Sequence, residues 1–514
     1  MPSSEQIPSE PAPEKIPRFG IFRNWLSLAG VVIAVGSLFC FVLLLLLDAM
    51  AHFSNPYVGI LMYMVVPFFL VTGMFLTVFG LLWDRWHRRK VAGLPQAFQI
   101  NLGRQRDRRI LGIFLSCSGV FLLVSAIGSY QTYRFTESTE FCGESCHTVM
   151  EPELVGHSQG SHARVECVAC HIGPGAAWYV KSKLSGMYQV YATLTDKYPR
   201  PIATPIKNLR PAQETCEQCH WPAKFVGNLD RTYNTFLSDV SNTPFTIRLT
   251  MKVGGGDPTR GPVGGIHWHM NVGNKVEYIA AKLANGKWVP DETRQNIPWV
   301  RVTNSQGVVT EYGVKGFNPK MADATIRQMD CMDCHNRPAH AFQTPDEAVN
   351  LAISMGEIDR GLPWIKKNTL AALGRHYTSQ TDALQGIATT LAETYPADKF
   401  PAEQQQASVR AAIAATQEIY RDNFFPAMNA SWANYPNNIG HKDWPGCFRC
   451  HDGNHLTTDS KRSIKANDCN ACHTILAQGT GAELDQLTTN GQKFKHPGDE
   501  VDGGCTDCHN GGGM

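Results

Sequence analysis

The sequence reads Cys167-Val168-Ala169-Cys170-His171, and this Cys-x-x-Cys-His pattern occurs six times in 514 residues. A seventh copy, Cys142-Gly-Glu-Ser-Cys146-His147, is longer by one residue. The amino-acid composition predicts roughly 0.02 copies by chance, so the repetition is not accidental. The cysteine pairs, first to seventh motif, are Cys142/Cys146, Cys167/Cys170, Cys216/Cys219, Cys331/Cys334, Cys447/Cys450, Cys469/Cys472 and Cys505/Cys508, and the following histidines are His147, His171, His220, His335, His451, His473 and His509.

The spacing of these residues suits covalent haem. Two thiols reach the two vinyl groups of one porphyrin, and the adjacent imidazole binds the iron. Zinc sites or disulfides would not require a histidine directly after every second cysteine. We therefore expect seven covalently bound haem c groups. The other two cysteines, Cys40 and Cys117, lie in apolar segments and are expected to pack there.

Each low-spin haem also needs a second axial ligand, and nine histidines remain in the part of the chain that holds the motifs. Those near a motif or in a Gly-rich turn are the expected ligands: His162, His340, His441, His455, His496 and one of His267 or His269. His157 and His376 fit a structural role equally well. Met150 follows His147 by three positions, so it either ligates the first iron or merely packs beside it.

Three apolar stretches precede the motifs: Trp25 to Leu47, Gly59 to Trp83 and Ile110 to about Tyr130. Each is long enough to span a bilayer as a helix. The loop at 48–58 lacks Lys and Arg, whereas the loop at 84–109 carries eight, which predicts that this second loop is cytoplasmic. We therefore expect a multi-pass protein of the bacterial inner membrane, with an inside N-terminus and all motifs in the periplasm. The net charge of +2 gives no reason to expect a nucleic-acid partner.

The predicted fold is mostly α-helical, with loop-rich multihaem domains, three transmembrane helices and a small β insertion. Residues 244–315 have the pattern of strands, with a hairpin from Trp299 to Tyr312, and residues 345–425 have helical patterns without cysteine. The expected domains are a disordered cytoplasmic tail at 1–23, a membrane domain at 24–132, a tetrahaem domain with the β insertion at 133–344, a helical spacer at 345–435 and a trihaem module at 436–514.

Between Cys142 and about His340 the chain resembles the NapC/NirT family of membrane-anchored periplasmic cytochromes, which oxidise quinol and pass electrons to a partner. Its first motif has a nearby Met150, as in the family. His162 lies five residues before the second motif, and His340 lies five after the fourth. The resemblance implies that His162 ligates the fourth haem and His340 the second, and that Lys183 and Asp196 lie at a quinone site.

The chain departs from simple members of this family in three ways: its first motif is expanded, three spans replace one, and three haem motifs are added at the C-terminal end. These features resemble heptahaem inner-membrane cytochromes of metal-reducing bacteria, which feed extracellular respiration.

The resemblance implies a quinol dehydrogenase, which takes electrons from menaquinol or ubiquinol and delivers them to periplasmic cytochromes or reductases. Quinol oxidation releases protons, and Asp196 is either a proton acceptor or an ordinary solvated carboxylate. An alternative function is an electron-relay or anchoring subunit of a larger respiratory complex without its own quinone site. A catalytic multihaem reductase would need an iron with an open position, and the histidine that ends every motif argues against that.

Overall fold

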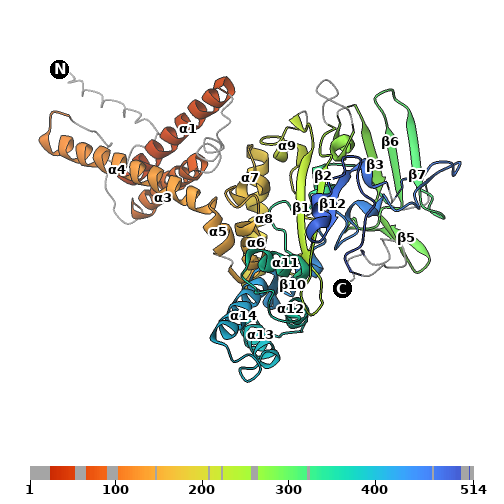
Figure 1. Cartoon of the computed structure of the whole chain (residues 1–514). Helices are drawn as coiled ribbons and strands as arrows, with labels where there is room; N and C mark the ends of the chain where they lie inside the picture. The colour runs from red at the N-terminus through yellow and green to blue at the C-terminus, as the bar shows by residue number, and fades with distance from the viewer. Residues whose placement is uncertain are drawn as a thin grey trace, which may run out of the picture. The chain divides into compact units, whose positions relative to one another are not determined.

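The computed structural model describes residues 24–51, 65–88, 102–144, 147–206, 209–221, 224–255, 264–271, 273–320, 324–465, 468–498 and 509. The chain divides into two compact units (Figure 1). The first comprises residues 1–136 together with 174–181, and the second comprises 137–173 and 182–514. The expected disordered tail at 1–23 lies outside the described residues.

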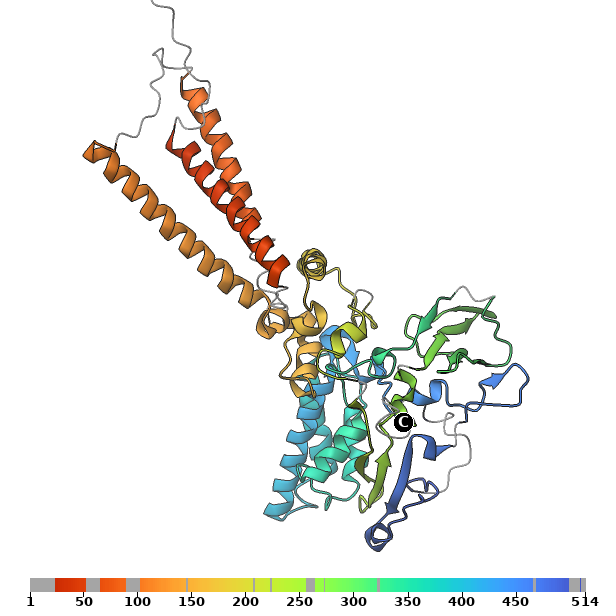
Figure 2. The same ribbon diagram turned by 90° about the horizontal axis from the view of Figure 1, so that it is seen from above.

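The first unit contains three long helices, α1 (Trp25–Ala51), α3 (Val66–Arg88) and α4 (Gln105–Thr136). Helices α1 and α3 run alongside each other, in red and orange in Figure 2. Glycine permits this close approach, since a Cβ at Gly73 would lie 2.6 Å from the backbone nitrogen of Ala34. The amide of Asn24 donates to the carbonyl of Gly80 at 2.7 Å, which joins the two helices at one end.

Two segments of the described residues are long and apolar enough to cross a membrane: Trp25–Leu44, with a mean hydropathy of 2.5, and Val66–Asp84, with 2.0. The structure thus supplies two candidate spans where three were expected. The third expected span, 110–130, is helical within α4, but many of its side chains lie outside the described residues. The third crossing therefore stays a prediction, and the two loops that set its orientation also fall largely outside the described residues.

The second unit begins with short helices around the first haem motifs: α5 (Thr139–Glu144), α6 (His147–Gln159), α7 (Cys167–His171), α8 (Ala176–Leu194) and α9 (Ala212–Cys216). The later motifs lie on α10 (Cys331–Cys334) and on the 3-10 turns η7 (Gly446–Arg449) and η8 (Cys469–Ala471). The first residues of α8, up to Lys181, are grouped with the first unit.

Two antiparallel sheets organise the motifs. Strands β1 (Leu229–Phe236), β2 (Pro244–Met251) and β12 (His473–Gly479) form one sheet in that order. The other has the order β11 (Leu456–Thr457), β7 (Val309–Gly313), β6 (Trp299–Thr303), β3 (Lys275–Ile279) and β8 (Ile326–Gln328). A hairpin of β4 (Ala281–Ala284) and β5 (Lys287–Pro290) stands beside them.

The C-terminal segment is woven into these sheets. His473 at the start of β12 pairs with Met251 of β2, and Leu456 of β11 pairs with Gly313 of β7 (Figure 1). The residues expected to form a separate C-terminal haem module therefore complete sheets that the middle of the chain begins. This arrangement fixes the fifth and sixth motifs against the β region.

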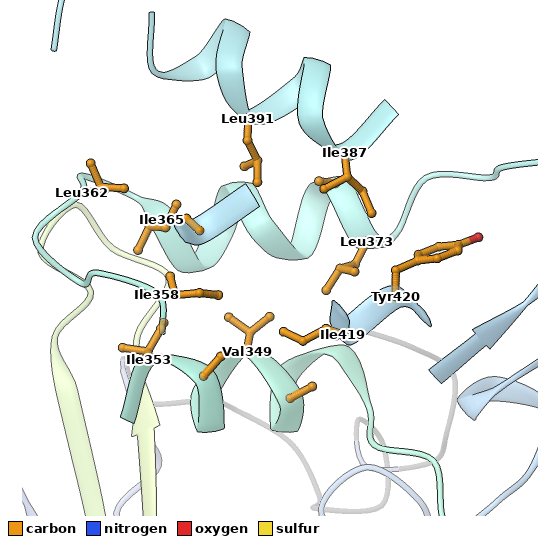
Figure 3. Close-up of a cluster of buried hydrophobic side chains, with 14 of the residues drawn as sticks. Val349, Ile353, Ile358, Leu362, Ile365, Leu373, Ile387, Leu391, Ile419 and Tyr420 are labelled. Atoms are coloured by element: carbon orange, nitrogen blue, oxygen red, sulfur yellow. The ribbon is translucent and has the colours of Figure 1, made fainter. Parts of the chain in front are cut away.

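Four helices, α11 (Pro345–Met355), α12 (Ile365–Leu373), α13 (Gln380–Thr394) and α14 (Glu403–Asn423), occupy the stretch expected to be a helical spacer. Thr344 and Glu347 form a capping box that starts α11. The apolar faces of the helices meet in a core (Figure 3) whose fully buried members include Val349, Ile365 and Leu391. After α14 the chain passes through β9 (Phe424–Phe425), η5 (Pro426–Met428), β10 (Ala430–Ser431) and η6 (Trp432–Asn434), and η9 (Gly481–Asp485) follows β12.

Candidate haem sites

The third, fourth and fifth motifs each fold as a single helical turn. The backbone N–H of the motif histidine donates to the carbonyl of the first cysteine at 2.8 Å in His220 and His335 and at 3.0 Å in His451. This bond closes one turn of the chain and so holds both thiols and the imidazole on one short segment. The pattern Cys-x-x-Cys-His has the length of that turn.

The structure places six motif histidines next to six histidines from elsewhere in the chain. The ring centroids are 6.0 to 6.5 Å apart in the pairs His171–His340, His220–His162, His335–His267, His451–His269, His473–His441 and His509–His496. Two imidazoles bound to one iron from opposite sides would have centroids about 6.2 Å apart, since each metal–nitrogen bond is about 2.0 Å long and each nitrogen lies about 1.1 Å from its ring centre. The gap in every pair fits one iron atom.

The hydrogen bonds of the partner histidines leave the correct nitrogen available. Nδ1 of His162 lies 3.0 Å from the Pro338 carbonyl, and Nδ1 of His340 lies 2.9 Å from the Glu153 carbonyl. Three further partners bond a backbone carbonyl in the same way through Nδ1: His267, His269 and His496. A proton held on Nδ1 leaves the lone pair of Nε2 free for a metal, the arrangement typical of ligating histidines.

Burial favours the neutral imidazole that a metal requires. It lowers the pKa of six of these histidines below the usual value: His171, His335, His340, His441, His451 and His473. A deprotonated ring is the form that coordinates iron. Electrostatics and hydrogen bonding therefore agree with the ring spacing.

His455, which was expected to be a ligand, has hydrogen bonds at both ring nitrogens. Its ring is buried, with Nδ1 2.8 Å from a carboxylate oxygen of Asp452 and Nε2 2.6 Å from the carbonyl of Ile297. With both nitrogens occupied by hydrogen bonds, no lone pair is left for iron. His269 faces His451 instead, so both members of the pair His267 and His269 face a motif histidine, where one was expected.

His157 shows why the ring distance needs the hydrogen bonds beside it. Its ring lies 6.0 Å from His340, as close as the motif histidine His171 at 6.2 Å. However, Nε2 of His157 lies 2.9 Å from the carbonyl of Val165 and is therefore occupied. His162 faces His220 of the third motif, whereas the family resemblance implied the fourth; the fourth motif, at His335, faces His267.

Neighbouring motifs approach each other through their cysteines. The Cys142 and Cys167 thiols interact, which raises the pKa of Cys142 and lowers that of Cys167. The Cys216 and Cys331 thiols of the third and fourth motifs interact in the same way, which raises the pKa of Cys216 and lowers that of Cys331. These sulfur atoms are the ones that haem would bond covalently, so the attachment points of consecutive motifs lie side by side.

Electrostatic contacts extend this series through the remaining motifs. The thiol of Cys170 interacts electrostatically with the thiol of Cys219. The thiol of Cys447 does so with the thiols of Cys334 and Cys472. The sixth motif adjoins the seventh, because His441, the partner of His473, interacts with His509. The motifs thus follow one another in space in the order of the sequence.

A buried polar network locks the fourth motif to the fifth. The carboxylate of Asp333 accepts hydrogen bonds from the Tyr278 hydroxyl at 2.5 Å and from Arg294 at 3.0 Å. The Asp333 carbonyl accepts a bond from Arg449 at 2.6 Å. Asp333 and Arg449 each stand between the two cysteines of a motif, so these contacts fix the spacing of the two motifs directly.

The ends of the motif series are less fully described. Cys146, Cys505, Cys508 and the side chain of His147 lie outside the described residues. Met150 is half-buried on α6, and its ligand role stays a prediction.

The two residues expected at a quinone site lie in different surroundings. Lys183 forms an ion pair with Glu137 at 2.5 Å, and both charges act on the thiol of Cys142. Asp196 is exposed, and a hydrogen bond from Arg200 at 2.5 Å lowers its pKa. Sequence reasoning missed Glu137. Its position five residues before Cys142, at the end of a long apolar helix, was the available signal.

Comparison with known proteins found one family and one relative. Residues 104–213 match the model of the NapC/NirT cytochrome c family, N-terminal region. The cytochrome c-type protein ImcH of Geobacter sulfurreducens is 40% identical over 503 residues, which cover 95% of this chain and 96% of that protein. No solved structure matches the chain.

These matches define a multihaem c-type cytochrome of electron transport. The chain belongs to the NapC/NirT cytochrome c family and carries covalently bound haem c. Together with the two apolar helices, family membership indicates a membrane-anchored protein.

Proposed function

We propose that this chain is a heptahaem quinol dehydrogenase of the bacterial inner membrane that passes electrons to periplasmic acceptors. The observation that carries the proposal is the set of six histidine pairs with gaps of 6.0 to 6.5 Å. Two histidines holding each of these six irons would suit electron transfer, because no position on them would be left open for a substrate. When bound, haem supplies one-electron chemistry at iron.

The order of the motifs supports a directed path. Consecutive motifs adjoin one another from Cys142 at the first to His509 at the seventh. The first motif follows the last membrane helix, α4, by six residues, so electrons entering there come from the membrane side. The seventh motif, at the other end of the series, is the proposed exit toward periplasmic cytochromes or reductases, including those that serve extracellular respiration.

Oxidation of a quinol to a quinone releases two electrons and two protons, so the entry site needs a side chain that accepts protons. Glu137 is a carboxylate beside Cys142, and its partner Lys183 can hold the quinol hydroxyl or the developing anion. Asp196 is the weaker candidate, because its exposed carboxylate is paired with Arg200 and does not act on the thiol of Cys142. We therefore assign proton acceptance to Glu137 and orientation of the quinol to Lys183.

The test compares the variants E137Q, K183M and D196N in the full-length holoprotein. Each is mixed with a menaquinol analogue and, separately, with dithionite, which reduces haem without a quinone site. We expect E137Q and K183M to slow reduction by quinol at least tenfold while reduction by dithionite is unchanged, and D196N to behave like the parent. If the parent itself takes no electrons from menaquinol or ubiquinol, the chain is a relay or anchoring subunit.

The proposed orientation has three crossings with the haem motifs in the periplasm. Eight basic residues between 84 and 109 support it through the positive-inside rule. A reporter that is active only in the periplasm, fused after Met514, is expected to be active. A silent reporter on a fully assembled holoprotein would overturn this orientation.

A further inference from the structure

Helix α8 (Ala176–Leu194) exposes its apolar face instead of burying it. Leu184, Met187, Tyr188, Tyr191 and Leu194 recur at intervals of three and four, so they share one face of the helix. All five side chains are 50% to 81% exposed. A helix of a water-soluble protein normally turns such a stripe toward the core.

The opposite face of α8 is less exposed, and after the half-buried aromatic residues Trp178 and Tyr179 at its start it consists mostly of small or polar residues. Ala192 is buried, and Ser182, Gly186 and Thr193 are half-buried. A helix surrounded by water would bury its large apolar residues, whereas α8 exposes them and buries smaller residues on its other face. The exposed stripe runs from Leu184 to Leu194, eleven residues that span about 15 Å of helix.

The surroundings of this stripe identify what covers it. Helix α8 contains no acidic residue. At one end Lys181 lies over the ring of Trp178 at 4.8 Å, and at the other Lys197 lies over the ring of Tyr191 at 5.2 Å. Aromatic rings with cationic side chains at both ends of an apolar stripe are typical of segments at the boundary between membrane and water. The first residues of α8 also belong to the same compact unit as the membrane helices.

We propose that α8 is an interfacial helix that lies in the plane of the bilayer, with Leu184, Met187, Tyr188, Tyr191 and Leu194 inserted among the lipid acyl chains and its lysines at anionic headgroups. Lys183 then stands at the edge of the inserted face, at the level of the headgroups. This inference rests on the helix and its neighbours, and it holds whether or not quinol is the substrate.

The test uses the full-length holoprotein in nanodiscs of phosphatidylethanolamine and phosphatidylglycerol that contain a phospholipid with a diazirine high on its acyl chain. After irradiation, lipid adducts are mapped by peptide mass spectrometry. We expect several-fold more adducts on the five stripe residues than on Leu283 and Leu351, which are exposed apolar residues of the second unit. The polar positions Ser185 and Gln189 of the same helix are expected to stay at the background level.

A variant with L184Q and M187Q supplies the second measurement. We expect it to keep the parental haem content while adducts on the remaining stripe residues fall severalfold, whereas S185Q leaves them unchanged. Labelling of α8 at the level of Leu283 in the parent would overturn the proposal. Slow amide exchange of the unlabelled helix would then mean that haem or a protein partner covers the stripe.

Discussion

Replacing His269 and His455 separately by alanine distinguishes the ligand that the structure supports from the one expected by nearness to a motif. His455 follows His451 by only four residues, whereas His269 precedes it by 182. In the structure the distant histidine faces His451 at a ring distance of 6.1 Å, and His455 is occupied by two hydrogen bonds.

The two substitutions should have different consequences of known size. H269A removes one axial nitrogen from one haem, so about one seventh of the haem iron should become five-coordinate. H455A leaves the Asp452 carboxylate and the Ile297 carbonyl without their buried partner, at a cost of about 1–3 kcal/mol for each unsatisfied group. H455A should therefore lower the free energy of unfolding without opening an iron position.

Carbon monoxide binding to the reduced holoprotein measures the first effect, and urea unfolding followed by far-ultraviolet circular dichroism measures the second. H267A should bind carbon monoxide like H269A, because His267 faces His335 in the same way. H376A, an exposed histidine, should match the parent in both assays. Carbon monoxide binding by H455A, together with none by H269A, would refute the reasoning from ring distance and hydrogen bonds.

Three further predictions concern the whole chain and its buried charges. The intact mass should exceed that of the polypeptide by seven haem masses, and an excess of six would mean that the expanded first motif is not used. D333A removes the buried partner of Arg294 and Tyr278 and should lower the free energy of unfolding by about 3–5 kcal/mol. The control E403A, at an exposed ion pair, should change that free energy little. Equal effects of the two substitutions in urea unfolding would contradict this prediction. Burial alone would raise the pKa of Asp346, but Lys442 and a second lysine lower it. The ionised Asp346 therefore stabilises the folded protein above the unfolded pKa of about 3.9, and this stabilisation is lost as the pH falls through the lower folded pKa. The parent should lose more free energy of unfolding than D346N between pH 7 and about pH 3.

Local features of the fold followed from the sequence because they depend on neighbouring residues. The helical pattern from Pro345 to Met355 coincides with α11, where the chain itself supplies a capping box at Thr344 and a left-handed Gly356 that ends the helix. The expected hairpin from Trp299 to Tyr312 corresponds to β6 and β7, joined at Asn304 to Gly307. The haem motifs are local in the same sense, since the third, fourth and fifth motifs each close one helical turn.

The partner of each motif could not be predicted because it depends on contacts between distant parts of the chain. His267 and His269 both point to motifs because the short helix η4 (Ile266–Met270) is held by backbone bonds to Lys252 and Gly254. A Cβ at Gly265 would collide with the carbonyl of Lys252, and its φ of 113° also favours glycine, so the turn that presents these histidines requires glycine. Nothing in the residues beside His451 indicates that its partner comes from this turn.

The ion pair between Glu137 and Lys183 could not be predicted from the sequence for the same reason. The two residues are 46 positions apart, and the contact arises only when α8 returns beside α5 and the first motif. The family resemblance drew attention to Asp196, whose carboxylate instead binds Arg200 four residues later. Charge pairs across a fold are set by its topology, which the spacing of residues does not reveal.

A redox-titrated absorption spectrum of the purified protein, with quantification of haem and of carbon monoxide binding, tests the central claim most directly. The seven motifs predict seven haems in each chain. The six histidine pairs predict that at least six of these haems are low-spin in both redox states and unreactive toward carbon monoxide. Carbon monoxide binding by two or more haems of the parent would show that these pairs do not enclose iron, and would contradict the account.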